Sequence, residues 1–125
     1  MLTTASEKRL IGIHPKLAEL IRKSSVNSPF AFVITEGLRT EARQKQLVAQ
    51  GASRTMKSKH LTGHAIDFAV IIGGKADFHF HLYEKVSTHM KKVAAKVGLT
   101  ITWGGDWKSF KDGCHIELDP KKYPF

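Results

Sequence analysis

The sequence predicts an α+β fold, in which a small, mainly antiparallel sheet packs against helices. Segments with helical spacing of apolar residues alternate with short apolar runs rich in β-formers, in the order helix, helix, strand, helix, strand, helix, strand, strand. The chain has 125 residues, of which 42% are hydrophobic, and it shows no internal repeat and no linker rich in Gly, Pro or Ser. It can therefore bury one core, and we expect residues 1–125 to form a single domain.

The helices are predicted from apolar periodicity and from end signals. Residues 15–23, PKLAELIRK, repeat apolar residues on one face, behind a proline suited to a first turn. Residues 40–50 form a later helix, with Thr40 as the N-cap and Gly51 as the stop. In residues 82–97 the predicted apolar face consists of Val86, Met90, Val93 and Val97.

Four short segments are predicted as strands. Residues 30–35, FAFVIT, form a compact apolar run typical of a buried strand. In residues 64–71, HAIDFAVI, apolar side chains alternate along one face. Residues 100–103 and 113–118 complete the set.

Some polar residues do not fit the elements that contain them. Asp67 lies inside an apolar strand, where an unpaired carboxylate is costly to bury. His115 shares one face of GCHIEL with Glu117, and His60 precedes the Asp67 strand in a loop that can fold back. Two imidazoles and one carboxylate suit catalytic zinc with a fourth position open. Each residue alone is better explained as a polar side chain with a local partner, and the spacing His-x6-Asp is not widely diagnostic.

Charge and composition restrict the partners. The formal net charge of +9 favours something anionic: nucleic acid, a membrane surface or an acidic polymer. The basic residues are scattered, so a generally cationic surface explains them as well. We find no apolar run of transmembrane length and no secretory signal pattern, and the single Cys114 cannot form an internal disulfide, which fits a reducing compartment.

Three motifs carry a family resemblance. SKHLTGHAID at 58–67 resembles the S-x-H-x-x-G-x-A-x-D signature of the M15 zinc peptidases. KDGCHIEL at 111–118 is similar to their second signature, and EGLRT at 36–40 to their G-x-R-[ST] segment. The likeness covers nearly the whole chain, in family order, and is strongest to the short phage endolysins. It implies a hedgehog/D-Ala-D-Ala peptidase-like fold, with residues 1–125 as one catalytic domain and no separate wall-binding domain.

The resemblance also implies the site. It implies one Zn²⁺ per chain, bound by His60, Asp67 and His115. It implies Asp112 as the acid/base carboxylate beside the metal and Arg39 as the residue that binds substrate oxygens and stabilises the oxyanion.

Further residues are assigned around these positions. Ser58 is expected to bind substrate or orient the loop, although a capping hydroxyl is as good an interpretation. Trp107 is expected to line the cleft, with Trp103 and Asp106, although structural tryptophans are more common. Gly63 is expected to form a turn with positive φ. His64 is expected beside the ligands or the substrate. Glu117 is expected to fix the tautomer of a histidine, or else to be a surface carboxylate. Cys114 lies where the relatives are expected to have proline, and it is expected to be a small buried hydrophobe.

The function that the resemblance implies is hydrolysis of the L-Ala–D-Glu bond in the stem peptide of peptidoglycan, by a phage or prophage endolysin. Such an enzyme is expected in the host cytoplasm until a holin releases it to the wall. Its cationic surface would then meet the anionic cell envelope, with no nucleic-acid partner, no stable membrane insertion and a monomeric state. The alternatives are a D,D-carboxypeptidase or dipeptidase of the same superfamily and a non-catalytic, cationic wall-binding module.

Overall fold

A five-stranded sheet forms the centre of the computed structural model, which describes residues 2–53, 55–109 and 111–124. The strand order is β1-β2-β5-β4, β3 pairs with β2, and every pairing is antiparallel. The strands are β1 (Phe32–Glu36), β2 (Ala65–Ile72), β3 (Lys75–Asp77), β4 (Ile101–Trp103) and β5 (His115–Leu118). The predicted α+β class is confirmed.

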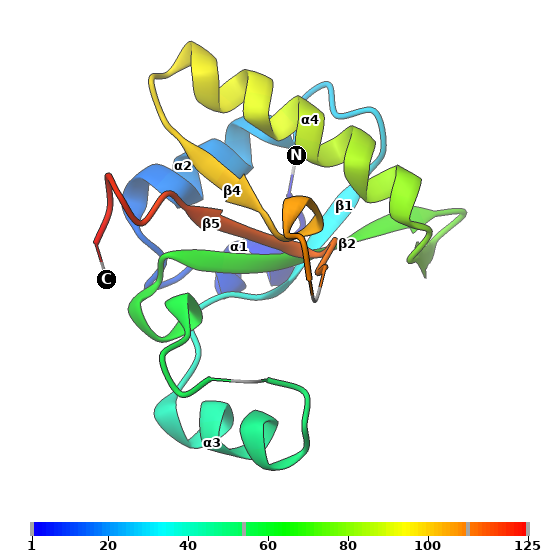
Figure 1. Ribbon diagram of the computed structural model, residues 1–125. Helices are drawn as coiled ribbons and strands as arrows, with labels where there is room; N and C mark the ends of the chain where they lie inside the picture. Colours follow the sequence, from blue (N-terminus) through cyan, green and yellow to red (C-terminus); the bar gives the residue numbers. More distant parts are fainter. Residues whose placement is uncertain (1, 54, 110, 125) are drawn as a thin grey trace.

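The α-helices are α1 (Thr4–Arg9), α2 (Pro15–Ser24), α3 (Glu41–Ala49) and α4 (Phe80–Lys96). Helices α1, α2 and α4 belong to the body around the sheet, whereas α3 stands apart from it (Figure 1). Helices α2 and α4 lie beside each other along the sheet, and α1 contacts β1. Two short 3₁₀ turns, η1 (Lys59–Thr62) and η2 (Gly104–Asp106), lie before β2 and after β4.

The core follows the predicted apolar faces. The buried side chains of α2, β2 and α4 include Leu17, Leu20, Ile21, Ile66, Phe68, Val70, Val86 and Met90. Val97 is an exception, because α4 ends at Lys96 and leaves Val97 49% exposed, while Ala94 takes the buried position. The prediction that the apolar face of this helix reaches Val97 is therefore wrong.

One strand was not expected from the sequence. β3 turns back on the end of β2 through Gly73 and Gly74, which both have positive φ. The segment lacks the alternating apolar pattern on which strand prediction depends, because its residues are mostly exposed. Among the described residues, no helix combines the length and the apolar character needed to cross a membrane.

Candidate metal centre and its cleft

Asp67 and His115 meet because β2 and β5 are neighbouring antiparallel strands. The register pairs Asp67 directly with His115, and Oδ1 of Asp67 lies 3.3 Å from Nδ1 of His115. The neighbouring positions Ile66 and Phe68 point into the core and are fully buried. Strand alternation therefore turns the Asp67 carboxylate to the opposite face, where it meets polar partners instead of the core.

His60 reaches the same place from η1, in the connection before β2. The ring is 3% exposed, and its Nδ1 lies 3.0 Å from the carbonyl oxygen of Gly37. A carbonyl oxygen only accepts, so Nδ1 carries the proton and donates it there. This leaves Nε2 of the neutral ring as the nitrogen with a lone pair, and it lies 3.4 Å from Oδ2 of Asp67.

The turn that carries His60 is fixed at both ends. Ser58 caps it by accepting a hydrogen bond from the backbone N–H of His60 at 3.2 Å. Gly63 ends it with a φ of 76°, as predicted, and a Cβ there would come within 2.5 Å of the carbonyl oxygen of Gly12. Both the backbone conformation and the close packing thus require glycine at position 63.

The three donor atoms fit a metal ion. His60, Asp67 and His115 each offer one ligand atom, and these atoms lie within 4.8 Å of one another. In a tetrahedral zinc site with bonds near 2.1 Å, two ligand atoms are about 3.4 Å apart. Oδ1 of Asp67 lies 3.3 Å from Nδ1 of His115 and Oδ2 lies 3.4 Å from Nε2 of His60, so each carboxylate oxygen is about this far from one imidazole. The donor set of two imidazoles and one carboxylate suits catalytic zinc.

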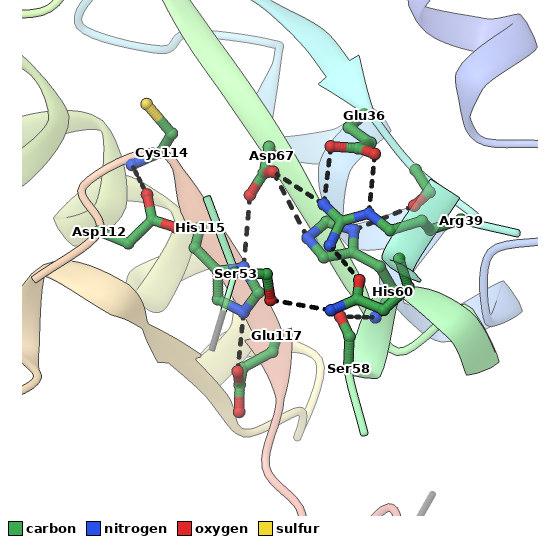
Figure 2. A network of polar contacts seen from close by, with 12 residues as sticks. Glu36, Arg39, Ser53, Ser58, His60, Asp67, Asp112, Cys114, His115 and Glu117 are labelled. Atoms are coloured by element: carbon green, nitrogen blue, oxygen red, sulfur yellow. Dashed lines mark hydrogen bonds and ion pairs between the residues drawn. The ribbon is translucent and has the colours of Figure 1, made fainter. Parts of the chain in front are cut away.

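Glu117 holds the second nitrogen of His115 (Figure 2). Its Oε1 lies 2.7 Å from Nε2 of His115, its Oε2 lies 2.5 Å from Nζ of Lys59, and Glu117 is only 5% exposed. A carboxylate accepts from the ring, so Nε2 carries a proton and Nδ1 is the nitrogen presented to Asp67. The interpretation of Glu117 as a surface carboxylate is wrong.

The contacts around the cluster shift the pKa values of Asp67, His115 and Glu117. Burial by itself raises the pKa of Asp67, but the contacts with His115 and His60 outweigh burial and hold that pKa well below its usual range. Burial lowers the pKa of His115, but hydrogen bonds to Asp67 and Glu117 raise it to about 9. Burial likewise raises the pKa of Glu117, and the contacts with His115 and Lys59 lower it overall. The carboxylates are therefore ionised at neutral pH, and His115 must release a proton before it can bind a metal.

Arg39 lies next to the cluster and is itself firmly held. Its side chain is 8% exposed, and Nε and Nη2 donate to the two oxygens of Glu36 at 2.8 and 2.7 Å. Nη1 donates to Oε1 of Gln44 at 2.7 Å, and Nη2 lies 3.8 Å from Oδ2 of Asp67. Arg39 is thus a largely buried, fully oriented side chain, although it lies directly before the start of α3.

Asp112 occupies the turn before β5, at the exposed rim. Its backbone N–H donates to the carbonyl oxygen of Gly104 at 3.0 Å, and its own carbonyl oxygen accepts from the N–H of His115 at 3.2 Å. A Cβ at Gly104 would come within 2.3 Å of that carbonyl oxygen, so the approach of η2 to this turn requires glycine. Partial burial, and then the negative charge of Asp67, raise the pKa of the Asp112 carboxyl.

These residues share one cleft of about 440 Å³. Arg39, His60, Asp67, Asp112 and His115 all line it. We call the part of the lining contributed by α3 and the loop after it the α3 wall, and its residues are Leu47, Ala52, Ser53, Thr55 and Lys57. Ser58, Lys59, Trp107 and Glu117 complete the described lining. The candidate metal centre is therefore open to a molecule larger than water.

Comparison with known proteins agrees with this geometry. A family model described as phage L-alanyl-D-glutamate peptidase matches residues 1–121. The chain belongs to the phage L-alanyl-D-glutamate peptidase family. It is 34% identical over 128 residues to the L-alanyl-D-glutamate peptidase of Escherichia phage T5, covering 90% of this chain and 93% of the relative.

Solved structures show the same relationship. The crystal structure of the Serratia marcescens L-Ala D-Glu endopeptidase ChiX superposes with a TM-score of 0.94 at 38% identity, over 99% of this chain and 93% of that one. The vancomycin resistance D,D-dipeptidase VanXYg, solved with a D-Ala-D-Ala phosphinate analogue, superposes with a TM-score of 0.54 at 16% identity, over 85% of this chain and 50% of that one. At that identity the likeness concerns the fold alone.

The WGGDW stretch contributes one residue to the cleft of this family member. Trp107 lines the cleft, with its ring centroid 5.1 Å from that of His115. Trp103 is instead a core residue, 3% exposed, and its Nε1 donates to the carbonyl oxygen of Gly113. Asp106 pairs with Lys91 at the surface. Trp103 and Asp106 are thus not part of the described cleft lining, and the alternative of a structural tryptophan is correct for Trp103.

One further expectation needs correction in this member of the family, and one holds in part. His64 is absent from the described lining of the cleft, and its ring contacts Thr62 and the ring of His14. In the described part of the chain its ring contacts are thus with Thr62 and His14, not with the candidate ligands. Cys114 packs against the core only partly buried, and its sulfur points away from the ligand cluster (Figure 2). Burial raises the pKa of its thiol to about 11.

Sequence reasoning missed three residues that hold the site in this peptidase fold. Glu36 and Lys59 lie inside the motifs EGLRT and SKHLTGHAID, so their place beside Arg39 and His60 in the sequence was a signal of a role at the site. Gln44, which is fully buried, lies in a helix whose sequence gives no sign of its role.

Proposed function

We propose that this chain is a zinc endopeptidase that hydrolyses the L-Ala–D-Glu bond of the peptidoglycan stem peptide. The observation that carries the proposal is the convergence of His60, Asp67 and His115 in a cleft with Asp112 at its rim. The relatives with the highest coverage are named for peptidase activity on this bond, which supports the same substrate class.

The metal ligands in this proposal are Nε2 of His60, the Asp67 carboxylate and Nδ1 of His115. When bound, zinc supplies Lewis-acid polarisation of the scissile carbonyl and lowers the pKa of a water molecule to about 7. Glu117 keeps the proton on Nε2 of His115, so that the ligand nitrogen stays directed into the site.

Asp112 is the proton carrier in this proposal. Its carboxylate takes the proton of the attacking water and returns it to the amine of D-Glu as the peptide bond breaks. Its position on the cleft supports this role, as does a pKa raised by burial and by Asp67, because a carboxyl that both accepts and donates needs a pKa nearer to neutral.

Arg39 stabilises the oxyanion that forms on the scissile carbonyl. Bonds to Glu36 and Gln44 engage three of its five N–H groups within the described part of the chain, so the guanidinium is oriented before substrate arrives. Trp107 offers an aromatic surface for the stem peptide, and Ser58 acts through the turn that carries His60.

In its biological setting the enzyme acts as an endolysin. We propose that it accumulates in the host cytoplasm and reaches the wall after a holin opens the membrane. The charge of +9 then draws a monomer to the anionic envelope. Neither nucleic acid nor a bilayer is a partner in this scheme.

Digestion of purified Gram-negative peptidoglycan tests the proposal. The zinc-loaded protein is expected to release peptides that begin with D-Glu and to leave muramyl-L-Ala, as identified by mass spectrometry, and a zinc chelator is expected to abolish both products. Release of free D-Ala would replace this function with a D,D-carboxypeptidase. Binding to the wall without any new amine would leave only a non-catalytic module.

A further inference from the structure

Gln44 connects three segments around the cleft without lining it. The residue lies in α3 and is 0% exposed, although its neighbours Arg43 and Lys45 are exposed. A buried amide is costly unless its donors and acceptor are satisfied. Its contacts therefore show what the position does.

Every polar group of the Gln44 amide has a partner near the site. Oε1 accepts from Nη1 of Arg39 at 2.7 Å. Nε2 donates to Oγ of Ser53 at 2.8 Å and to the carbonyl oxygen of Thr55. Two of these partners, Ser53 and Thr55, belong to the α3 wall, and the third lines the cleft near the metal ligands.

The contacts continue from Gln44 to the sheet. Arg39 is bound through two hydrogen bonds to Glu36 at the end of β1, and it lies 3.8 Å from the Asp67 carboxylate. Because α3 stands apart from the body of the molecule, the α3 wall has little apolar packing to hold it (Figure 1). The amide of Gln44 thus links the wall to the arginine beside Asp67.

A purely structural role is the simpler alternative for Gln44. In that case the residue would only stabilise α3, and an apolar side chain of equal length would serve there. The partners of Gln44 do not fit this alternative. Its acceptor Oε1 binds Arg39, and its two N–H groups bind the loop of the α3 wall. An apolar side chain could not fix the distance between these two parts of the cleft.

We propose that Gln44 is a positioning residue that sets the α3 wall relative to Arg39 and the metal ligands, and thereby fixes the width of the cleft for the stem peptide. The role in turnover rests on the proposed function, whereas the link between Gln44 and the wall does not. Gln44 itself does not touch the reacting bond.

Hydrogen exchange and kinetics of Gln44→Met test this role. The matched control is Gln46→Met, which changes an exposed glutamine of the same helix. In Gln44→Met, amide exchange is expected to accelerate in residues 52–57 but not in β2 and β5, while zinc affinity stays that of the wild type. kcat/KM on a stem peptide is expected to fall about tenfold, mostly through a higher KM, because the groups that bind substrate lose their alignment.

Two more variants keep the result interpretable. Gln44→Glu keeps an acceptor for Arg39 and loses both donors, so it is expected to loosen residues 52–57 as the methionine does. Ser53→Ala removes one loop partner without touching the helix and is expected to give a smaller effect of the same kind. The proposal is overturned if residues 52–57 exchange as in the control, or if exchange rises equally throughout the protein. A wild type that cleaves no stem peptide would refute the proposed function, but the exchange experiment would still decide whether Gln44 holds the wall.

Discussion

Glu117 and His115 lie two residues apart on β5, with Oε1 of the carboxylate 2.7 Å from Nε2 of the ring. Adjacent residues of a strand face opposite sides, so the i, i+2 spacing is what brings both side chains to the same face. The carboxylate in turn contacts Lys59, next to the candidate ligand His60 in sequence. Glu117 and Lys59 thus form a network of charged groups at Nε2 of His115, the ring nitrogen that does not face Asp67.

Glu117→Gln is expected to weaken zinc binding about 10–100-fold, because the partner of a ligand histidine loses its charge while the fold keeps its shape. Competition with a chromophoric chelator measures the change. Glu19→Gln is the control, since that carboxylate pairs with Lys23 on the exposed face of α2. Equal zinc affinity in Glu117→Gln and wild type would show that Glu117 does not support the ligand.

Zinc affinity is expected to increase with pH. The contacts of His115 raise its pKa to about 9, so the ring is protonated at neutral pH and must lose a proton to bind the metal. With one proton coupled to binding, the apparent affinity rises about tenfold per pH unit below that pKa. Chelator competition at pH 6, 7 and 8 measures the slope, and calorimetry in buffers of different ionisation enthalpy counts the protons released. A flat profile would contradict the expectation.

Asp112→Asn is expected to keep the fold and the zinc affinity and to lower kcat about 10²–10⁴-fold, because the amide cannot carry the proton from water to the leaving amine. Asp106→Asn is the matched control, since Asp106 is an exposed carboxylate paired with Lys91 in the same region. Near-normal turnover of Asp112→Asn, with zinc bound, would rule out the assigned role.

Gly63→Ala is expected to destabilise the protein by about 1–3 kcal/mol more than Gly51→Ala. Both glycines have a φ near +75°, so the conformational cost is shared, but only at Gly63 would the added Cβ meet a backbone oxygen, that of Gly12. Urea denaturation of the two variants isolates the steric part. Because the turn carries His60, zinc affinity is expected to fall in Gly63→Ala alone. Equal stability of the two variants would show that the N-terminal segment yields to the added methyl group.

Strand period in the sequence predicted the faces of two candidate ligands, Asp67 and His115, whereas His60 lies in a turn without such a period and was assigned through the family resemblance. Alternation placed Asp67 away from the core face of β2 and His115 on the same face as Glu117, and both placements hold in the structure. His64 was expected beside the ligands or substrate. η1 is a 3₁₀ turn and the left-handed Gly63 redirects the chain between the two histidines, so the ring of His64 contacts Thr62 and His14.

Gln44 could not be predicted in the same way. The helix EARQKQLVA holds two glutamines two residues apart, and neither periodicity nor capping separates the buried Gln44 from the exposed Gln46. The difference arises from tertiary contacts, because the Gln44 amide bonds Arg39 on one side and Ser53 and Thr55 on the other. The prediction that the apolar face of α4 reaches Val97 was wrong for a related reason. The helical period continues in the sequence beyond Lys96, the residue at which α4 ends.

The thiol of Cys114, the single cysteine of the chain, can be used to measure motion at the start of β5. Cys114 immediately precedes His115, and only its thiolate reacts with alkylating reagents. With a pKa near 11 and a half-buried sulfur, it reacts slowly as long as β5 stays in place. The rate of its alkylation therefore reports how often the start of β5 opens, without any engineered label.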